Sequence, residues 1–297
     1  MSDLGRDAPR DAHTDSQPGK AAVLGSPIAH SLSPALHRAA YTELNLDWTY
    51  EAVECDEASL PGFLDGLDPS WAGLSLTMPL KRAVLPLLDE VSELASAVGG
   101  ANTVVLAGGR RYGDNTDVPG MVDALASGGV TRASSAVVLG TGATACSALA
   151  ALRELGVTEV VVAARDFSRT RDLAATAARL GSPVRLRRVE EVREGGAAAL
   201  AVDVLISTLP SGAADQFVPL LTSEGGSGAG APATVFDVVY DPWPTNLAEA
   251  GRRAGSQVIG GFELLLHQAA RQVQLMTGYE NVPIDAMRDA GKRVMNG

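Results

Sequence analysis

The sequence predicts an α/β protein built of two domains. From Lys20 onward, short runs rich in β-branched residues alternate with alanine-rich amphipathic stretches, the pattern of a parallel sheet covered by helices. The chain has 297 residues, which exceeds a typical single domain of roughly 100 to 200 residues. With 46% hydrophobic and 20% charged residues, its composition is that of a protein with a large buried core.

Charge and composition narrow the class of function. Twenty-four basic residues against 35 acidic ones give a net charge of −11, which opposes binding to nucleic acid or to an anionic membrane surface. No segment reaches the roughly 18 apolar residues that a membrane span needs. The polar residues 1–20 are predicted to be a disordered leader, since they lack the apolar run of a signal peptide. Two distant cysteines, Cys55 and Cys146, fit a reducing cytoplasm.

The first domain is expected to begin at residue 21 and to close at 117. Its first strand is the apolar run AAVLG, and its last segment is the polar sequence GDNTD at 113–117. Between them, β-branched and amphipathic segments alternate. The predicted elements are strands at 21–25, 48–55, 73–79 and 101–106 and a helix at 34–44.

The second domain, residues 118–260, is expected to be of the Rossmann type. A helix around 119–126 opens it, and the apolar strand SAVVLG then runs through a tight turn directly into a helix that begins TGATAC. The small residues SEGGSGAGAPA at 223–233 predict a surface loop. A long amphipathic helix at about 262–277 is expected to return to the first domain, which then also takes residues 261–297. Further strands are predicted at 157–165, 202–210 and 234–240.

The turn GTGATA has the signature of a dinucleotide-binding site. Gly140 allows the sharp turn, Gly142 lets the backbone approach a pyrophosphate at the positive end of the helix, and Ala145 fills the third small position. A glycine turn can also join a strand to a helix for structural reasons alone, but here both flanking elements are clear. The predicted cofactor contacts in this turn are Gly140, Thr141, Gly142, Ala143, Thr144 and Ala145.

Residues at the end of the next strand favour NADP over NAD. An NAD site usually carries an acidic residue about 20 positions after the turn, where it holds the ribose 2′-hydroxyl. Here Ala164 stands at that place, and Arg165 and Arg169 follow, two guanidiniums suited to a 2′-phosphate. We therefore predict a large preference for NADPH over NADH. Asp166 argues the other way, because its carboxylate could hold a ribose hydroxyl, and the arginines could simply solvate a helix start.

Four polar motifs lie where strands of the first domain end or helices begin, and two further motifs lie near the end of the chain. In order they are SPIAHSLSP, SLTMPLK, GGANT, GDNTD, YDPWPT and LLLHQA. With the glycine turn between the fourth and fifth, this series resembles the shikimate dehydrogenase family over nearly everything after the leader. The resemblance implies a cytoplasmic, NADP-dependent enzyme, monomeric or homodimeric. Such an enzyme reduces 3-dehydroshikimate to shikimate in chorismate and aromatic amino acid biosynthesis.

The resemblance also implies roles for individual residues. Its substrate ligands would be Ser31 and Ser33 with Tyr240 at the carboxylate, and Thr77, Asn102 and Gln268 at the ring hydroxyls. Its catalytic pair would be Lys81 and Asp117, at the oxygen that switches between ketone and alcohol. Its contacts with the cofactor's ribose and nicotinamide would be Ser207, Thr208, Leu209, Val238 and Gly261. Where the family commonly has asparagine, this chain has Ser75, whose shorter side chain would reach the substrate through water.

Elementary chemistry supports Lys81 and Asp117 independently. Hydride arriving at a carbonyl carbon leaves negative charge on the oxygen, so a positioned cation and a proton donor lower the barrier, typically by about 10²- to 10⁴-fold. A lysine serves both needs, and an aspartate can fix its ammonium group. Each residue alone is ordinary, because a lysine after a proline usually begins a solvated helix and an aspartate in NTD usually caps one.

Other classes of function fit the sequence less well. A close alternative is a quinate/shikimate dehydrogenase that works oxidatively with NAD. A non-catalytic NADPH-binding sensor would keep the glycine turn but would not need the Lys81 and Asp117 pair. A structural scaffold would not need polar clusters at its strand ends. No metal is expected, because the histidines lack carboxylate or cysteine companions at ligand spacing.

Overall fold

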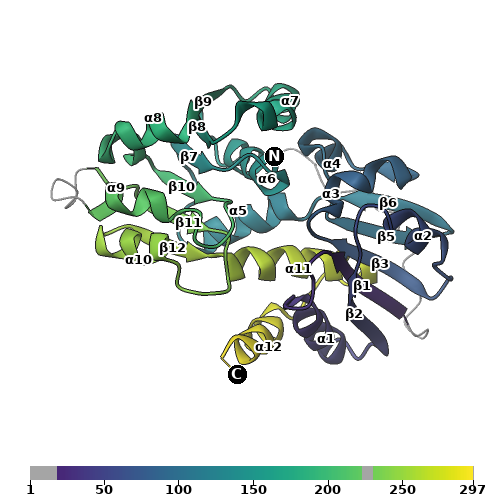
Figure 1. Ribbon diagram of the computed structural model, residues 1–297. Coiled ribbons are helices and arrows are strands. Elements are labelled where there is room, and N and C mark those ends of the chain that lie inside the picture. Colours follow the sequence, from purple (N-terminus) through teal and green to yellow (C-terminus); the bar gives the residue numbers. More distant parts are fainter. Residues whose placement is uncertain (1–18, 223–229, 297) are drawn as a thin grey trace. The chain divides into compact units, whose positions relative to one another are not determined.

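The computed structural model describes residues 19–222 and 230–296. Most of the predicted leader and most of the loop expected at 223–233 therefore lie outside the described residues. The chain divides into two compact units, of which the first runs to Asp117 and resumes at Leu266, and the second is Val118–Leu265 (Figure 1). The second boundary falls inside one continuous helix, α11 (Gly261–Thr277), which begins at the boundary expected from the sequence.

The first unit contains a mixed sheet in the order β2-β1-β3-β5-β6-β4. β1 pairs in parallel with β2 and β3, whereas β5 lies antiparallel to both β3 and β6. Nearly every residue of β1 and β3 is buried, as expected for strands covered on both faces. The strands are β1 (Gly19–Gly25), β2 (Trp48–Glu54), β3 (Trp71–Leu76), β4 (Glu90–Val91), β5 (Thr103–Ala107) and β6 (Arg110–Asp114).

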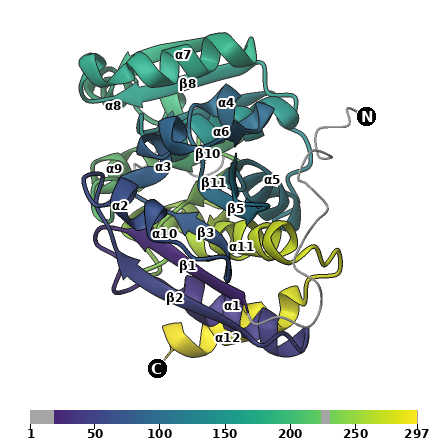
Figure 2. The same ribbon diagram turned by 90° about the vertical axis from the view of Figure 1, so that its right-hand side faces the viewer.

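Helices in this unit bury their apolar stripes on the sheet and on one another. Leu64 and Leu80, from two short helices, pack in one cluster with Leu24 and Leu74 of the central strands. The first helix and the last helix of the chain lie side by side next to β2 (Figure 2). The helices are α1 (Ser33–Glu43), α2 (Leu60–Asp65), α3 (Leu80–Ala83), α4 (Glu93–Val98) and α12 (Ile284–Met295), with a 3-10 turn η1 (Leu85–Leu87).

The second unit contains an all-parallel sheet in the order β12-β11-β10-β7-β8-β9. Counted from β7, this is the doubly wound Rossmann order, whose ligand crevice lies where the strand order reverses, between β7 and β10. The strands are β7 (Ser135–Leu139), β8 (Glu159–Ala164), β9 (Val184–Arg188), β10 (Val204–Ser207), β11 (Thr234–Asp237) and β12 (Gln257–Gly260). The predicted α/β class and Rossmann-type second domain are confirmed.

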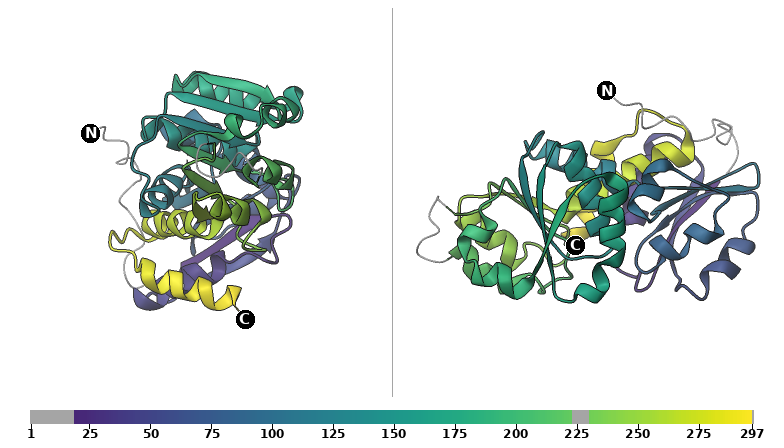
Figure 3. Two further views of the ribbon diagram at one scale, coloured as in Figure 1. Left: turned by 90° about the vertical axis from the view of Figure 1, so that its left-hand side faces the viewer. Right: turned by 90° about the horizontal axis from the view of Figure 1, so that it is seen from above.

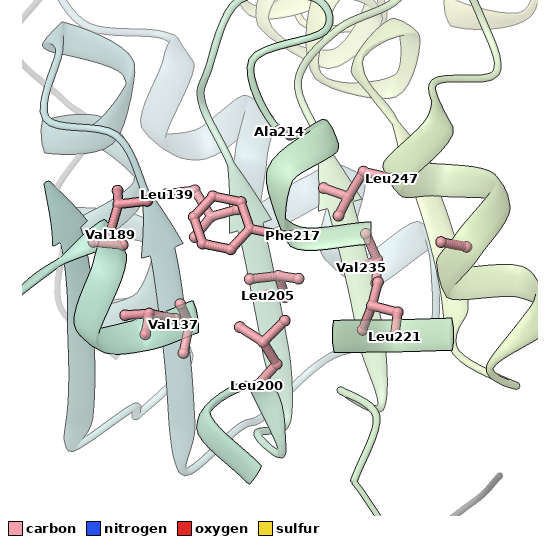
Figure 4. Packing of buried hydrophobic residues seen from close by; sticks show 13 residues of the cluster. Val137, Leu139, Val189, Leu200, Leu205, Ala214, Phe217, Leu221, Val235 and Leu247 are labelled. Carbon is pink, nitrogen blue, oxygen red and sulfur yellow. The ribbon is translucent and has the colours of Figure 1, made fainter. Parts of the chain in front are cut away.

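Helices cover both faces of this sheet (Figure 3). On one face, Val137, Leu205 and Val235 of three strands pack against Phe217 and Leu221 (Figure 4). The alanine-rich helix α6 packs on β7 outside this cluster. The helices are α5 (Asp117–Ser127), α6 (Ala143–Glu154), α7 (Arg171–Leu180), α8 (Val189–Glu194), α9 (Val218–Thr222) and α10 (Asn246–Arg253), with 3-10 turns η2 (Phe167–Thr170), η3 (Ala197–Leu200) and η4 (Asp215–Phe217).

Three predicted strands extend three residues beyond the ends of the observed ones. The strands expected at 73–79, 202–210 and 234–240 stop earlier, at Leu76, Ser207 and Asp237. Polar residues and prolines follow each stop, and their backbone leaves the sheet to form loops. These loops carry five of the candidate site residues, Thr77, Thr208, Leu209, Val238 and Tyr240, so the early ends of the strands create positions where ligands can be bound.

Candidate active site

Lys81 and Asp117 form an ion pair in the first unit. Lys81 belongs to the short helix α3, and Asp117 is the first residue of α5. The Lys81 Nζ lies 2.5 Å from Asp117 Oδ2, and the two side chains are only 15% and 7% exposed. The structure thus brings together the two predicted catalytic residues, which are 36 positions apart in sequence.

Asn102 holds the second oxygen of the Asp117 carboxylate. The backbone N–H of Thr116 donates to Asn102 Oδ1 at 2.7 Å, and because an N–H can only donate, this bond fixes which end of the amide is the oxygen. The Asn102 Nδ2 then faces Asp117 and donates to its Oδ1 at 2.8 Å. The same Nδ2 lies 3.3 Å from Gln268 Oε1. Asn102 and Gln268, both predicted substrate ligands, therefore lie in one buried cluster with the Asp117 carboxylate.

Ser75 is part of a hydrogen-bond chain that the sequence did not suggest. Its hydroxyl accepts from Tyr50 at 2.6 Å and donates to Gln272 Oε1 at 2.7 Å, and all three side chains are buried. Gln272 Nε2 in turn donates to the Asn102 carbonyl and to Thr103 Oγ1, both at 3.1 Å. The predicted contact of Ser75 with substrate through water stays a prediction.

Gln272 could have been found from its spacing. It follows Gln268 by one helical turn on α11, so both amides lie on the same face of the helix. Tyr50 gave no comparable signal, because a tyrosine within a strand usually reflects packing alone. Burial raises the pKa of Tyr50, so its phenol stays protonated and acts as the donor to Ser75.

The remaining predicted substrate ligands of this unit lie at element ends. Ser33 begins α1, and Ser31, two residues earlier, accepts a hydrogen bond from the Ser33 N–H at 3.3 Å. Both serines thus stand at the positive end of an 11-residue helix, a position that suits a carboxylate. Thr77 follows β3 directly, in the loop that leads to Lys81.

In the second unit, the glycine turn has the geometry that a dinucleotide requires. Gly140 has φ of +112°, which strongly favours glycine, and a Cβ there would overlap the Thr208 side chain. A Cβ on Gly142 would meet no atom within 4 Å, so open space adjoins the backbone at the start of α6. The helix end can therefore receive a pyrophosphate, and the residues present fit a dinucleotide cofactor.

Asp166 makes its hydrogen bond within its own turn. Its Oδ1 accepts the Ser168 N–H at 2.8 Å and caps the turn η2, and its Oδ2 lies 3.9 Å from Arg169 Nε. Hydrogen bonds from Ser168 are the main cause that lowers the pKa of Asp166, and the nearby arginines add to it. The carboxylate that argued against NADP is thus engaged within its own turn. Arg165 and Arg169 are exposed beside it.

The other predicted cofactor residues follow β10 and β11, next to the point where the strand order reverses. Thr208 Oγ1 donates to the Leu139 carbonyl at 2.9 Å, which ties the end of β10 to the glycine turn. Gly261 approaches the Val238 backbone so closely that any Cβ would overlap its carbonyl group. Burial, aided by the Asp241 carboxylate, raises the pKa of Tyr240 and keeps its phenol protonated. Ser207 is fully buried, and Leu209 is half-buried.

Asp237 is a buried carboxylate that the sequence reasoning missed. It ends β11 and accepts hydrogen bonds from Thr245 Oγ1 at 2.8 Å and from the Val239 N–H at 3.3 Å. Burial raises the pKa of Asp237, and the hydrogen bonds oppose that shift. The two bonds close the loop that carries Val238 and Tyr240, so Asp237 fixes the segment in which two predicted ligands lie.

Other kinds of site have no support in the part of the chain that is described. Within residues 19–222 and 230–296, no three His, Cys, Asp or Glu side chains gather to hold a metal ion. Over the same ranges, no helix combines the length and the apolar character that crossing a membrane would take. Cys55 and Cys146 are free, buried thiols.

The fold and the two sets of residues define a class of protein. A Rossmann unit with a dinucleotide turn, and a second α/β unit with a buried lysine-aspartate pair, are the parts of a dinucleotide-dependent oxidoreductase. Comparison with known proteins identifies the family. The shikimate dehydrogenase substrate binding domain matches residues 23–104, and the shikimate 5′-dehydrogenase C-terminal domain matches residues 261–290.

Full-length relatives agree. A shikimate dehydrogenase (NADP(+)) of Thermus thermophilus is 37% identical over 92% of this chain and 98% of its own length. The crystal structure of Mycobacterium tuberculosis shikimate dehydrogenase superposes with a TM-score of 0.83 at 43% identity, covering 93% of this chain and 100% of that one. A quinate dehydrogenase of Corynebacterium glutamicum in complex with NAD has a TM-score of 0.81 at 30% identity, covering 93% and 100%. The chain belongs to the shikimate dehydrogenase family.

Proposed function

We propose that this protein reduces 3-dehydroshikimate to shikimate, reversibly and with NADPH, in the biosynthesis of chorismate and the aromatic amino acids. The observation that carries the proposal is the buried Lys81 and Asp117 pair, with Asn102 fixing the second carboxylate oxygen. Membership of the family supports the same reaction, since the curated Thermus relative is a shikimate dehydrogenase that uses NADP(+).

The chain's own residues handle the proton and the charge on oxygen. NADPH, when bound, supplies the hydride. As the carbonyl oxygen gains negative charge, the Lys81 ammonium donates a hydrogen bond to it and then a proton, which yields the alcohol. Asp117 accepts a hydrogen bond from that ammonium and holds it in place, while Asn102 prevents the carboxylate from rotating. In the oxidative direction, the neutral lysine takes the hydroxyl proton back.

Binding of the substrate follows from the polar ends of the elements. Ser31 and Ser33, at the start of α1, are the ligands of the substrate carboxylate, together with Tyr240. Thr77, Asn102 and Gln268 bind the ring hydroxyls. Two hydroxyls and a helix N-terminus favour an anion, and amide groups can both donate to and accept from an alcohol.

Residues of the second unit hold the cofactor. The backbone between Gly140 and Ala145 binds the pyrophosphate, and Arg165 and Arg169 bind the 2′-phosphate. The ribose and nicotinamide contacts are Ser207, Thr208, Leu209, Val238 and Gly261. The open space next to Gly142 supports a dinucleotide, and the hydrogen bond of Asp166 within its own turn supports NADPH.

A second candidate is oxidation of quinate or shikimate with NAD. Its specific support is the similarity to the NAD-bound quinate dehydrogenase of Corynebacterium glutamicum, at 30% identity. Both candidates share four further properties. These are small-molecule substrates, the absence of nucleic acid partners, a cytoplasmic location and a monomeric or homodimeric state. The acidic net charge of −11 supports the absence of nucleic acid partners, and the two free thiols support a cytoplasmic location.

Four rates distinguish these candidates. The purified protein is assayed with 3-dehydroshikimate and with 3-dehydroquinate, each with NADPH and with NADH. We expect rapid turnover only for 3-dehydroshikimate with NADPH. Comparable rates on 3-dehydroquinate with NADH would favour the second candidate. Tight binding of NADPH without turnover on either substrate would instead identify a non-catalytic sensor.

A further inference from the structure

The edge strand β9 brings a third arginine to the turn that follows β8. β9 pairs in parallel with β8, and its last residue, Arg188, lies opposite Ala164. Ala164 immediately precedes Arg165. An arginine from a separate segment of the chain therefore lies beside the pair that the sequence assigned to the 2′-phosphate.

One contact holds Arg188 over this turn, and its charge acts on the same turn. Its guanidinium lies 5.0 Å from the centre of the Phe167 ring, within the range of a cation-π interaction. Its charge, like that of Arg169, also helps to lower the pKa of the Asp166 carboxyl group. Arg188 and Arg169 thus approach the same carboxylate, from β9 and from η2. Phe167, which is 39% exposed, supports the guanidinium without neutralising it.

The charges around the turn suit a phosphate monoester. Three arginines and one aspartate leave two positive charges, and the aspartate is engaged with the Ser168 N–H. A phosphate monoester carries about −1.5 to −2 charges at neutral pH and offers three acceptor oxygens. A ribose hydroxyl, by contrast, would gain little from a third guanidinium.

We propose that Arg188 is a specificity-determining residue that binds the 2′-phosphate of NADPH together with Arg165 and Arg169. The inference rests on the proposed use of NADPH. Arg188, exposed and held on Phe167, is placed in advance, so little side-chain entropy is lost when the phosphate arrives. The preceding residue, Arg187, lies opposite Ala163 and 3.7 Å from Glu191, and it has no such role.

Binding of nucleotide fragments tests this directly. The probes are adenosine 2′,5′-bisphosphate, which carries the 2′-phosphate, and ADP, which lacks it. Calorimetry measures both Kd values for the full-length protein and for Arg188→Gln, Arg188→Lys and the matched control Arg187→Gln. For Arg188→Gln we expect the Kd of the bisphosphate to rise roughly 10-fold or more, as for a lost charge-assisted hydrogen bond. The Kd of ADP should stay unchanged, and Arg188→Lys should recover part of the loss.

Several outcomes would overturn the proposal. An unchanged bisphosphate Kd in Arg188→Gln would remove Arg188 from the phosphate site. An equal rise in the Kd of ADP would show that Arg188 supports the adenine and does not bind the 2′-phosphate. An equal rise in the bisphosphate Kd of Arg187→Gln would show a general effect of charge. The proposed function fails separately. It is rejected if the unaltered protein does not reduce 3-dehydroshikimate with NADPH, a rate that the fragment experiment does not use.

Discussion

The two sets of predicted ligands differ in how the protein holds them. In the first unit, Asn102, Asp117 and Gln268 are buried and joined by hydrogen bonds from several elements. In the second unit, Arg165 and Arg169 are exposed on one turn. In the proposed mechanism, the Lys81 Nζ must stay at one position relative to the substrate oxygen. Burial and several hydrogen-bond partners keep such a group in place. In the proposed function the arginines need only present positive charge to a phosphate group, and exposed side chains can do this.

This difference predicts which measurements respond to substitution. Changes in the buried cluster should alter turnover and the free energy of unfolding together. Changes at the exposed turn should alter the affinity for NADPH and leave the free energy of unfolding almost unchanged. The largest expected effects therefore lie in the first unit.

Lys81→Ala should lower kcat by about 10²- to 10⁴-fold, because the reaction loses its proton donor and the cation that stabilises the oxygen. The KM for 3-dehydroshikimate should change little. Steady-state kinetics measures both. Lys20→Ala is the matched control, since Lys20 also pairs with an aspartate, Asp68, at 3.3 Å, but both side chains are about half exposed. The control should keep its activity, and near-normal turnover in Lys81→Ala would exclude Lys81 from the mechanism.

His37 gives the first unit a predicted dependence on pH. The ring is fully buried, stacks on Tyr50 with 3.9 Å between centroids, and donates from Nδ1 to the Ser33 carbonyl. Burial lowers the pKa of His37 from 6.5 to about 4. The unfolded chain therefore takes up a proton between these values, and the folded chain does not. The contribution of His37 to the free energy of unfolding is fully present above pH 6.5. It is lost as the pH falls towards 4, and the loss is on the order of 3 kcal/mol.

Chemical denaturation at pH 7.5 and pH 4.5 measures this effect. His37→Phe retains an aromatic ring against Tyr50 but has no proton to gain, so its free energy of unfolding should fall less between the two pH values. An equal fall in the parent and in His37→Phe would place the acid sensitivity elsewhere, for example at carboxylates with lowered pKa such as Asp203.

Local patterns were sufficient to predict the Rossmann unit. β7 and β8 are short apolar runs, and the glycine turn between β7 and α6 has a backbone requirement that is visible in single residues. Strand β9 was missed because its segment, VRLRR, contains three arginines and lies at the sheet edge, where charged side chains are common. Arg188 was missed for the same reason.

Long-range contacts in the first unit could not be predicted in this way. Ser75 and Gln272 are 197 positions apart, and only the folded chain shows that their side chains meet. The resemblance to a family identified Lys81 and Asp117 as a pair, but it gave no indication of the chain from Tyr50 to Asn102 that supports them. β6 was not predicted, because its strand character comes from pairing with β5 and not from its polar side chains.

Gln272→Leu should test the support for Asn102. It removes the acceptor of the Ser75 hydroxyl and one of the two donors to the Asn102 carbonyl, which keeps the Leu76 N–H, so the free energy of unfolding should fall by about 2 to 3 kcal/mol and kcat by roughly 10-fold. Gln274→Leu is the control on the same helix. Gln274 is half-buried and accepts from Arg271 at 2.6 Å, so its loss should cost under about 0.5 kcal/mol. Normal turnover in Gln272→Leu, with reduced stability, would make Gln272 purely structural.

The smallest expected effect separates the glycines of the dinucleotide turn. Gly142→Ala should leave the free energy of unfolding unchanged, since the added methyl group meets no atom within 4 Å. It should raise the KM for NADPH roughly 10-fold, because the methyl group occupies the space through which a pyrophosphate approaches the backbone.

Gly140→Ala should behave differently from Gly142→Ala. With φ of +112° and the Thr208 side chain in the way, it should lower the free energy of unfolding by about 1 to 2 kcal/mol. Thermal unfolding and steady-state kinetics measure both variants. If Gly142→Ala lowered the free energy of unfolding but bound NADPH normally, the turn would only join β7 to α6. The proposed contrast between a buried catalytic cluster and an open cofactor site would then be wrong for this turn.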